Sequence, residues 1–395
     1  MTEGAGNRKR RVLVAGAGIA GLATALRLHQ AGWDVLVAER APARRSGGYL
    51  VNLLGQGYDA AERLGVLPAL AAHDLGAFAS VLVRSDGRKK LTVPAALAQA
   101  ALGGRALTVF RGDLESVLYD AVREVAGIRF GTVVREVTQD ADGVRVALSD
   151  GTSERAALLV GADGLHSGVR ELVFGSESGF RVDLRCVVGA FPLAEAPRDI
   201  PEGTGATFIG PGRTAAVLNL GPGRSSAFFT YRTPDPAAEL SQGPARALTA
   251  AFGDLGGGVP DALRQLTADP AGAYFDAVSQ IVTERWSHGR VVLLGDAAWC
   301  VTLFAGYGAA LALAGADRLG AVLEENGDDI ATALARWETP LRPEIRKRQA
   351  LARKGTSQYA PATRAHVLAR DLMIRTMTLP GIRGMVARSV QRSQR

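Results

Sequence analysis

Cysteine is scarce in this sequence, which has Cys186 and Cys300 and no other among 395 residues. Two cysteines cannot build a disulfide framework, and they do not show the spacing of metal ligands. The same lack of metal spacing holds for the five histidines, which are His29, His73, His166, His288 and His366. We therefore expect no bound metal, and this composition favours a reducing cytoplasm as the compartment.

Long apolar runs are missing as well. No stretch reaches the ~18 consecutive apolar residues that a membrane-spanning helix requires. The N-terminal MTEGAGNRKRR lacks the apolar core of a secretory signal. The net charge of +7 resides largely on arginines, and aromatic residues are not interleaved with them as stacking platforms for nucleic acid would require. We expect neither a nucleic-acid partner nor a membrane span.

The remaining composition, 47% hydrophobic and 22% charged, suits a globular protein with a sizeable core in two domains. Segment 11–40, RVLVAGAGIAGLATALRLHQAGWDVLVAER, predicts a strand, a tight turn, a helix and a second buried strand. Short alternating segments from 180 to 231 predict an antiparallel sheet, and helices follow over 237–266. From Ala309 onward the pattern is mainly helical, with breaks expected at Pro340, Pro361 and Pro380.

The turn GAGIAG carries the first functional signal. Gly16 allows the tight turn, Gly18 allows close approach of a pyrophosphate, and Gly21 allows the helix to pack on the strand. The helix N-terminus offers unpaired amides to the anion. Glu39 ends the second strand, where an acid can accept a hydrogen bond from a ribose hydroxyl. This is the single such fingerprint in the chain, which predicts one resident dinucleotide.

Three further turns bring charged residues to the ends of predicted elements. Arg111 in VFRGDL begins a helix predicted over 110–125, with Asp113 as its cap, and its forked donors suit a phosphate or a ring edge. LLVGADGLHSGVR ends a buried strand at Asp163, at the edge where open α/β sheets bind ligands. RVVLLGDAA repeats that pattern at Asp296. An acid among apolar residues needs a partner, and we predict that Asp296 binds a hydroxyl group of a ligand.

These motifs, in this order, resemble the class A (p-hydroxybenzoate hydroxylase-like) flavoprotein monooxygenases over residues 11 to about 350. The resemblance implies an α/β fold with an α+β insertion: an FAD-binding Rossmann-like domain, an inserted antiparallel sheet domain for the substrate and a helical C-terminus. It implies domain boundaries at 10–75, 101–175 and 275–335 for the FAD-binding domain, 76–100 and 176–274 for the sheet domain, and 336–395 for the C-terminal region.

The resemblance also implies which residues bind the cofactor. The ADP part of FAD is expected at the glycine turn and the end of the second strand, the pyrophosphate near the two strand-end acids, and the flavin ring near two glycine-rich loops. The residues are Gly16, Gly18, Ile19, Ala20, Gly21, Glu39, Arg40, Arg45, Gly47, Gly48, Arg111, Asp163, Asp296, Gly306, Gly308 and Ala309. Weaker candidates for substrate contact are Tyr49, Phe228, Trp299 and Leu303. No catalytic side chain is disclosed.

The chain departs from the family pattern at Trp299, where histidine is usual, and at Leu303, where proline is usual; Ala305 and Tyr307 replace a common Gly and Gln. Trp299 either stacks near the flavin ring or fills the core. His166 either approaches the cofactor or lies in a solvated loop. The basic, amphipathic segment from Arg364 either docks on the sheet domain or touches a membrane surface.

The expected activity is monooxygenation. In the family, NAD(P)H reduces FAD, and one atom of O2 is transferred to an electron-rich substrate, while the protein supplies orientation and excludes water. We expect hydroxylation or epoxidation of an aromatic or polyketide-like small molecule in natural-product metabolism or antibiotic modification. The alternatives are a non-redox enzyme, such as a cyclase, that keeps FAD as a structural element, and a carrier that binds an apolar molecule without chemistry.

Overall fold

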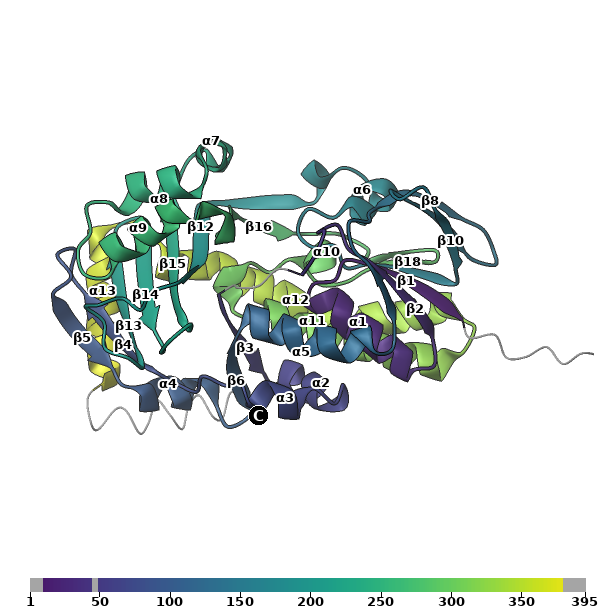
Figure 1. Ribbon diagram of the computed structural model, residues 1–395, viewed down its shortest axis with the longest axis horizontal. Coiled ribbons are helices and arrows are strands. Elements are labelled where there is room, and N and C mark those ends of the chain that lie inside the picture. The colour runs from purple at the N-terminus through teal and green to yellow at the C-terminus, as the bar shows by residue number, and fades with distance from the viewer. Residues whose placement is uncertain (1–9, 45–48, 379–395) are drawn as a thin grey trace, which may run out of the picture.

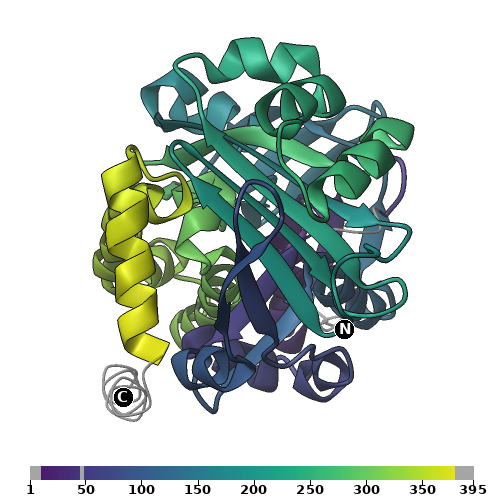
Figure 2. The same ribbon diagram turned by 90° about the vertical axis from the view of Figure 1, so that its left-hand side faces the viewer.

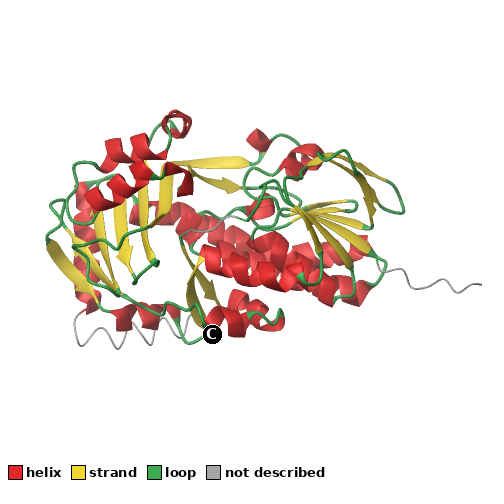
Figure 3. Ribbon diagram, in the orientation of Figure 1, coloured by secondary structure: helices red, strands yellow, loops and turns green. Residues whose placement is uncertain are grey.

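Two large sheets lie at opposite ends of the molecule, with long helices between them (Figure 1; Figure 3). The structure is a computed structural model that describes residues 10–44 and 49–378. The described residues also form two small sheets: a pair of β3 (Leu50–Leu54) and β6 (Ala106–Phe110), and a meander of β8 (Val134–Gln139), β9 (Val144–Leu148) and β10 (Ser153–Ala156). No helix in the described ranges is both long and apolar enough to cross a bilayer.

The six-stranded sheet carries the glycine-rich turn. Its order is β17 (Ser287–His288), β18 (Val291–Leu293), β11 (Leu158–Gly161), β1 (Arg11–Ala15), β2 (Asp34–Ala38) and β7 (Gly127–Arg129). The pairs among β18, β11, β1, β2 and β7 are parallel. Most residues of β18, β11, β1 and β2 are buried, and these strands are rich in Val and Leu, as expected for a parallel sheet covered on both faces. The predicted strand–turn–helix–strand unit is confirmed, with α1 (Ile19–Gln30) as its helix.

The antiparallel pairing predicted over 180–231 is confirmed, but the complete seven-stranded sheet is mixed, which corrects the expectation of a wholly antiparallel inserted domain. Its order is β16 (Tyr274–Ile281), β12 (Arg181–Leu193), β15 (Ser225–Arg232), β14 (Arg213–Asn219), β13 (Thr204–Gly210), β4 (Ala79–Val83) and β5 (Lys89–Val93). Strand β4 pairs with β13 in parallel. Because these two strands are far apart in sequence, no tight turn forces them to run in opposite directions. The other pairs are antiparallel.

Helices cover one face of the seven-stranded sheet. The predicted helical stretch 237–266 forms three of them, α7 (Pro236–Gln242), α8 (Pro244–Phe252) and α9 (Val259–Ala268), which glycines separate. Phe229 of the sheet packs against Phe252 of α8 with ring centroids 4.9 Å apart. On the opposite side of the molecule, α1 packs against α5 (Arg111–Arg123) and α11 (Gly308–Asn326). The remaining short helices are α2 (Gln56–Arg63), α3 (Leu67–Ala71), α4 (Ala95–Leu102), α6 (Gly168–Phe174) and α10 (Asp296–Trp299).

Two local predictions are wrong. Asp113 does not cap α5, because Phe110 occupies the N-cap position and Asp113 lies in the first turn. Pro340 does not end a helix: α12 (Ile330–Tyr359) runs through it. A proline leaves the carbonyl four residues earlier without its amide, and here Arg318 donates to that carbonyl, the oxygen of Arg336, at 3.3 Å. The buried side chains of α12 that pack on α11 offset the remaining cost.

Pro361 follows the end of α12 as predicted, and α13 (Arg364–Thr378) then lies along the edge of the seven-stranded sheet (Figure 2). Pro380 lies outside the described residues. The C-terminal segment therefore docks on the sheet, which was one of its two predicted placements.

Candidate functional site

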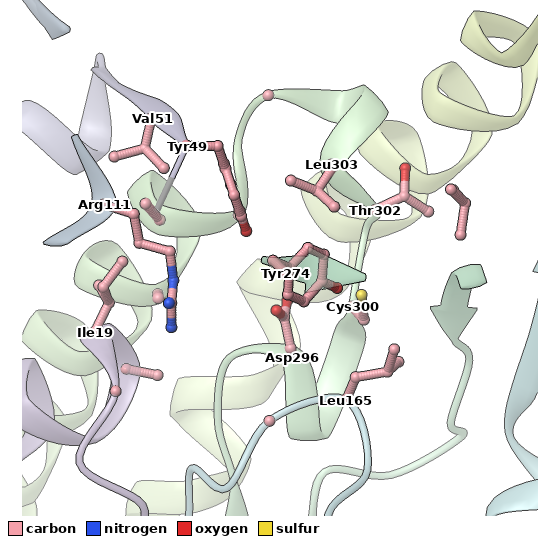
Figure 4. Close-up of a pocket in the computed structure, with 18 of the residues that line it drawn as sticks. Ile19, Tyr49, Val51, Arg111, Leu165, Tyr274, Asp296, Cys300, Thr302 and Leu303 are labelled. Carbon is pink, nitrogen blue, oxygen red and sulfur yellow. The ribbon is translucent and has the colours of Figure 1, made fainter. Parts of the chain in front are cut away.

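A cavity of about 210 Å³ opens between the two large sheets (Figure 4). Its walls come from the N-terminus of α1, the end of β11, the turn after β18, the N-terminus of α11 and two strands, β3 and β16. Among the described residues that line it, two carry charge, Arg111 and Asp296. The other walls are apolar side chains, backbone and neutral polar groups. The cavity therefore combines two opposite charges with a lining that is otherwise uncharged.

The GAGIAG turn has the shape that its glycines predict. Gly16 adopts a φ of +101°, and a Cβ there would lie 2.5 Å from the carbonyl oxygen of Ala162 on the neighbouring strand end. A Cβ on Gly21 would lie 1.9 Å from the carbonyl oxygen of Gly16. Gly18 is the N-cap of α1, and no side chain caps that helix. Gly18 and the first two helical residues, Ile19 and Ala20, line the cavity, so the uncapped helix end borders it.

Glu39 fixes the end of β2 to this turn. Its carboxylate accepts hydrogen bonds from the amides of Ala17 and Ala41, both at 2.7 Å. Glu39 and Arg40 line a second cavity of about 140 Å³, and Gly18 and Arg111 border both cavities. The two cavities are therefore adjacent and together form an elongated site along the start of α1.

Arg111 is the first residue of α5 and lies between the two cavities. Its guanidinium pairs with Glu115 one turn later at 2.6 Å. Burial opposes the charge of Arg111, but the carboxylates of Glu115 and Asp296, together with the phenol of Tyr49, raise its pKa. Arg111 therefore stays cationic inside the site and balances the acid on the opposite wall.

Asp296 begins α10 after Gly295, whose φ is +68°. Its side chain is accessible from the cavity, although protein surrounds it on the other sides. Burial raises the pKa of Asp296, and the charge of Arg111 and a hydrogen bond from the Cys300 thiol oppose this effect. The carboxylate thus has acceptor capacity directed at a ligand, which fits the predicted hydroxyl contact.

Asp163 and Asp296 both follow the end of a strand, but they differ in their position relative to the cavity. Asp163 does not line either cavity. Its carboxylate accepts hydrogen bonds from the hydroxyl of Ser167 and, at 3.0 Å, from the amide of Val169. These bonds shape the loop that begins α6, while the neighbouring Gly164 and Leu165 line the cavity. In this structure Asp163 supports the wall of the cavity.

Residues Gly306, Gly308 and Ala309 line the cavity at the start of α11. Gly306 adopts a φ of +65°, Tyr307 is the N-cap, and no side chain caps this helix. The cavity is therefore bordered by two uncapped helix N-termini, those of α1 and α11, whose partial positive charge favours electronegative ligand atoms. Of the remaining predicted cofactor residues, Arg45, Gly47 and Gly48 lie outside the described residues.

Trp299 does not contact the cavity, which corrects its place among the substrate candidates. Its ring is buried against Trp286 and Trp337, with centroids 4.7 and 5.7 Å away. The edge of the same ring faces Gly315 of α11, and Trp337 donates its indole N–H to the Gly315 carbonyl at 2.9 Å. Trp299 is thus a core residue behind the turn that carries Asp296.

Of the other three substrate candidates, two line the cavity and one does not. Tyr49 and Leu303 line the cavity. Phe228 does not line it and instead packs on Tyr359 at the end of α12, with ring centroids 6.4 Å apart. Phe228 lies away from the cavity wall because β15 is separated by β12 from β16, the strand that lines the cavity.

Sequence reasoning missed the wall that β16 supplies. Tyr274 faces the cavity opposite Tyr49, with ring centroids 5.7 Å apart, and burial raises the pKa of both phenols. Val278 and Ser279 continue this wall. Thr302 also lines the cavity; it has a φ of +80°, and its buried hydroxyl has no hydrogen-bond partner among the described residues. No sequence motif predicts that these residues line a cavity. The strained backbone of Thr302 and its unpaired hydroxyl can be recognised only in the folded structure.

Comparisons with known proteins agree with this geometry. A family model described as an FAD binding domain matches residues 9–331. The flavin-dependent monooxygenase eupH of Phoma sp is 32% identical over 333 residues, which cover 80% of this chain and 77% of that protein. The structure of Klebsiella pneumoniae HpxO with FAD and uric acid aligns with a TM-score of 0.79 at 26% identity and 96% coverage of each chain. The tetracycline destructase Tet(51), at 24% identity, shares the fold, with a TM-score of 0.80 and 98% coverage of each chain.

Proposed function

The chain belongs to the FAD-binding-domain family of FAD-dependent monooxygenases, and we propose that its paired cavities bind FAD beside an uncharged aromatic or polyketide-like substrate. Enzymes of this family are oxidoreductases that use NAD(P)H as co-substrate. The observation that carries the proposal for this chain is the elongated site, which combines an uncapped helix end, two opposite charges on facing walls and an otherwise uncharged lining.

The residues present fit a dinucleotide. A Cβ at Gly16 or Gly21 would collide with backbone, so the turn can exist only with these glycines, and it places the amides of α1 at the site. We assign the pyrophosphate to these amides and the ribose to Glu39, whose carboxylate already orders the turn through two amides. Asp296 and Arg111 would hold the part of the cofactor between pyrophosphate and ring.

Bound FAD supplies the redox chemistry: it accepts a hydride from NAD(P)H and allows one atom of O2 to be transferred to the substrate. The chain's part is to orient both partners and to exclude water. Leu303 and Val278 contribute apolar side chains to the cavity that the start of α11 at Gly308 also lines. The uncapped amides of α11 favour negative charge at this end.

The substrate class follows from the uncharged part of the cavity lining. Val51, Leu165, Val278 and Leu303 offer apolar surface, and the phenols of Tyr49 and Tyr274 offer neutral hydrogen bonds. The single cation among the described lining residues, Arg111, is already paired with Glu115. A carboxylate on the substrate would find no unpaired cationic side chain there, and we assign the partial positive charge of the α11 amides to the cofactor, so an uncharged ring system is the better ligand.

The non-redox alternative rested on Trp299 and Leu303. Because Trp299 packs in a core of three indoles away from the cavity, its size does not alter the site. We therefore retain monooxygenation. We further propose that the six-stranded and seven-stranded sheets are the centres of the cofactor and substrate domains, and that the protein acts in the cytoplasm.

The test uses the FAD-loaded protein with matched pairs of substrates, each a neutral phenol or polyketide aromatic and its carboxylated analogue. Oxidation of NADH and NADPH is followed together with incorporation of isotopically labelled O2 into product. We expect neutral members to stimulate NAD(P)H oxidation and to gain one labelled oxygen atom. Product formed without reductant consumption, or a preference for the carboxylated members, would contradict the proposal.

A further inference from the structure

Two tyrosines that line the cavity have hydroxyl groups without a partner in the described part of the chain. They are Tyr49 and Tyr274, whose ring centroids lie 5.7 Å apart. Among the described residues no group forms a hydrogen bond with either hydroxyl. The hydroxyl of Tyr231, by contrast, donates to Glu239 at 2.9 Å. Because a phenol that is removed from bulk water usually has a hydrogen-bond partner, these two hydroxyls are available to a ligand.

The two tyrosines differ in their neighbours. Tyr49 lies on the side of Arg111 in the close-up of the cavity, and the charge of Arg111 acts on its phenol (Figure 4). Tyr274 packs together with Leu303 against the apolar cluster that contains Phe304. Since Arg111 is assigned to the cofactor, Tyr274 is the better placed of the two tyrosines for contact with a substrate.

Strand β16 holds Tyr274 in a defined position. Tyr274 pairs with Ala190 of β12 in the antiparallel ladder. Side chains alternate along a strand, so Tyr274 and Val278 pack on one apolar cluster, while Phe275 packs on the cluster at the other face of the sheet. A side chain on a paired strand is placed more precisely than one on a loop. The Tyr274 ring is therefore a fixed part of the cavity wall.

The phenol of Tyr274 stays protonated at neutral pH. Burial raises its pKa well above the ordinary value, and the neighbouring Tyr49, Asp276 and Asp296 act in the same direction. The hydroxyl therefore has a proton to donate. A ligand ring without an oxygen atom would displace water from this hydroxyl and leave it unpaired, which weakens binding.

We propose that Tyr274 selects substrates that carry a hydroxyl or carbonyl oxygen on the ring, and that its hydroxyl donates a hydrogen bond to this oxygen. The inference rests on the proposed function, because it places the substrate in the same cavity as FAD. Val278 and Leu303 offer apolar contact to a ring with or without an oxygen atom. The hydroxyl of Tyr274 distinguishes the two kinds of ring, because a site that is built to form a hydrogen bond disfavours the analogue that lacks the oxygen.

The experiment measures the binding of 1-naphthol and naphthalene to the FAD-loaded full chain without NAD(P)H. The two probes have the same ring system and differ by one oxygen atom. Equilibrium dialysis gives the affinity of each probe for the wild type, for Tyr274→Phe and for the matched control Tyr359→Phe. Tyr359 packs against the same apolar cluster but does not line the cavity. Titration with FAD and the melting temperature show whether each variant binds the cofactor and is folded.

We expect the wild type and Tyr359→Phe to bind 1-naphthol about tenfold more tightly than naphthalene. Tyr274→Phe should lose this preference through weaker binding of 1-naphthol, with unchanged affinity for naphthalene and for FAD. The inference is overturned if the wild type binds the two probes equally or binds neither, or if Tyr274→Phe keeps the preference.

The titration with FAD separates this inference from the proposed function. Weaker FAD binding in Tyr274→Phe, with the naphthol preference retained, would place the hydroxyl at the cofactor and overturn the inference alone. A wild-type chain that does not bind FAD would contradict the proposed function, and the inference with it.

Discussion

The guanidinium carbon of Arg348 lies 3.7 Å from the centroid of the Tyr307 ring. Arg348 projects from the middle of α12, where it also pairs with Glu344 at 2.6 Å. Tyr307 is the N-cap of α11 and stands between two glycines that line the cavity. This cation–π contact therefore fastens the α11 turn, which begins the helix next to the proposed flavin site, to the long helix behind it.

Substitution of Arg348 is expected to loosen this turn. Arg348→Met should weaken FAD binding about twofold to thirtyfold, since a cation–π contact contributes about 0.5–2 kcal/mol. Tyr307→Phe keeps the ring face and should bind FAD as the wild type does, whereas Tyr307→Leu should resemble Arg348→Met. Quenching of flavin fluorescence measures the affinity, and Arg246→Met, an exposed arginine on α8, is the control. Equal affinity in Arg348→Met and the control would show that the contact does not position the turn.

The glycine turn gives a second prediction. Gly21→Ala places a methyl group 1.9 Å from the Gly16 carbonyl oxygen, a distance that forces the start of α1 away from β1. We expect purified Gly21→Ala to retain no FAD and to be less stable than the wild type. The matched control is Gly32→Ala, whose Cβ meets no atom within 4 Å, although its φ of +82° gives it a backbone cost of its own. Retention of FAD by Gly21→Ala would show that the turn tolerates displacement and does not shape the site.

Trp299 provides a prediction on stability. Removing a buried indole from a packed core costs about 3–5 kcal/mol, so Trp299→Ala should lower the free energy of unfolding by that amount. Its folded fraction should nevertheless bind FAD with nearly wild-type affinity, because the ring does not line the cavity. Denaturant titration and flavin binding on the same preparation separate these effects. An unchanged unfolding free energy with an altered flavin spectrum would place the ring at the cofactor instead.

His166 joins the two large sheets in a pH-dependent way. Its Nδ1 lies 3.0 Å from Glu177 and its Nε2 lies 3.4 Å from Asp276 of β16. Hydrogen bonding to Asp276 raises the pKa of His166 in the folded protein. The stabilisation is therefore fully present below about pH 6.5, the ordinary value for an unfolded chain, and is lost as the pH rises through the higher folded-state pKa.

The expected result is a pH-dependent difference between wild type and His166→Gln. The wild type should unfold at higher denaturant concentration than the variant at pH 5.5–6, about the range where an ordinary histidine is protonated, and the difference should shrink toward pH 9. Because the side chain is about half exposed, solvent screening keeps the effect modest. A difference that is constant across this range would mean that the protonated form of His166 is not favoured by folding.

Local sequence patterns predicted much of the fold because they act over short distances. The buried run VLVA and the three glycines of the first turn each determine the structure of their own neighbourhood. The failures have tertiary causes. A hydrogen bond from Arg318 and the packing of α12 allow Pro340 inside a helix, and a parallel pairing between β4 and β13 depends on chain segments that are far apart.

The residues of the site could likewise be predicted where a local sequence pattern marks them. Arg111 and Asp296 follow strands and turns that the sequence marks, and the fold brings them to one cavity. No sequence pattern predicts that Tyr274 and Thr302 line the cavity. The position of Tyr274 depends on how the two large sheets are placed, and that of Thr302 depends on a strained turn. Trp299 stands in a motif position, yet only the two other indoles around it reveal its role in packing.

The central claim is that one flavin nucleotide lies along the paired cavities, and titration of the purified, flavin-free protein with FAD tests it most directly. We predict one FAD bound per chain, at least about tenfold weaker binding in Asp296→Asn, which loses a charge-assisted hydrogen bond, and unchanged binding in Asp142→Asn on an exposed hairpin. Absence of FAD binding by the wild type, or equal affinity in the two asparagine variants, would contradict the account.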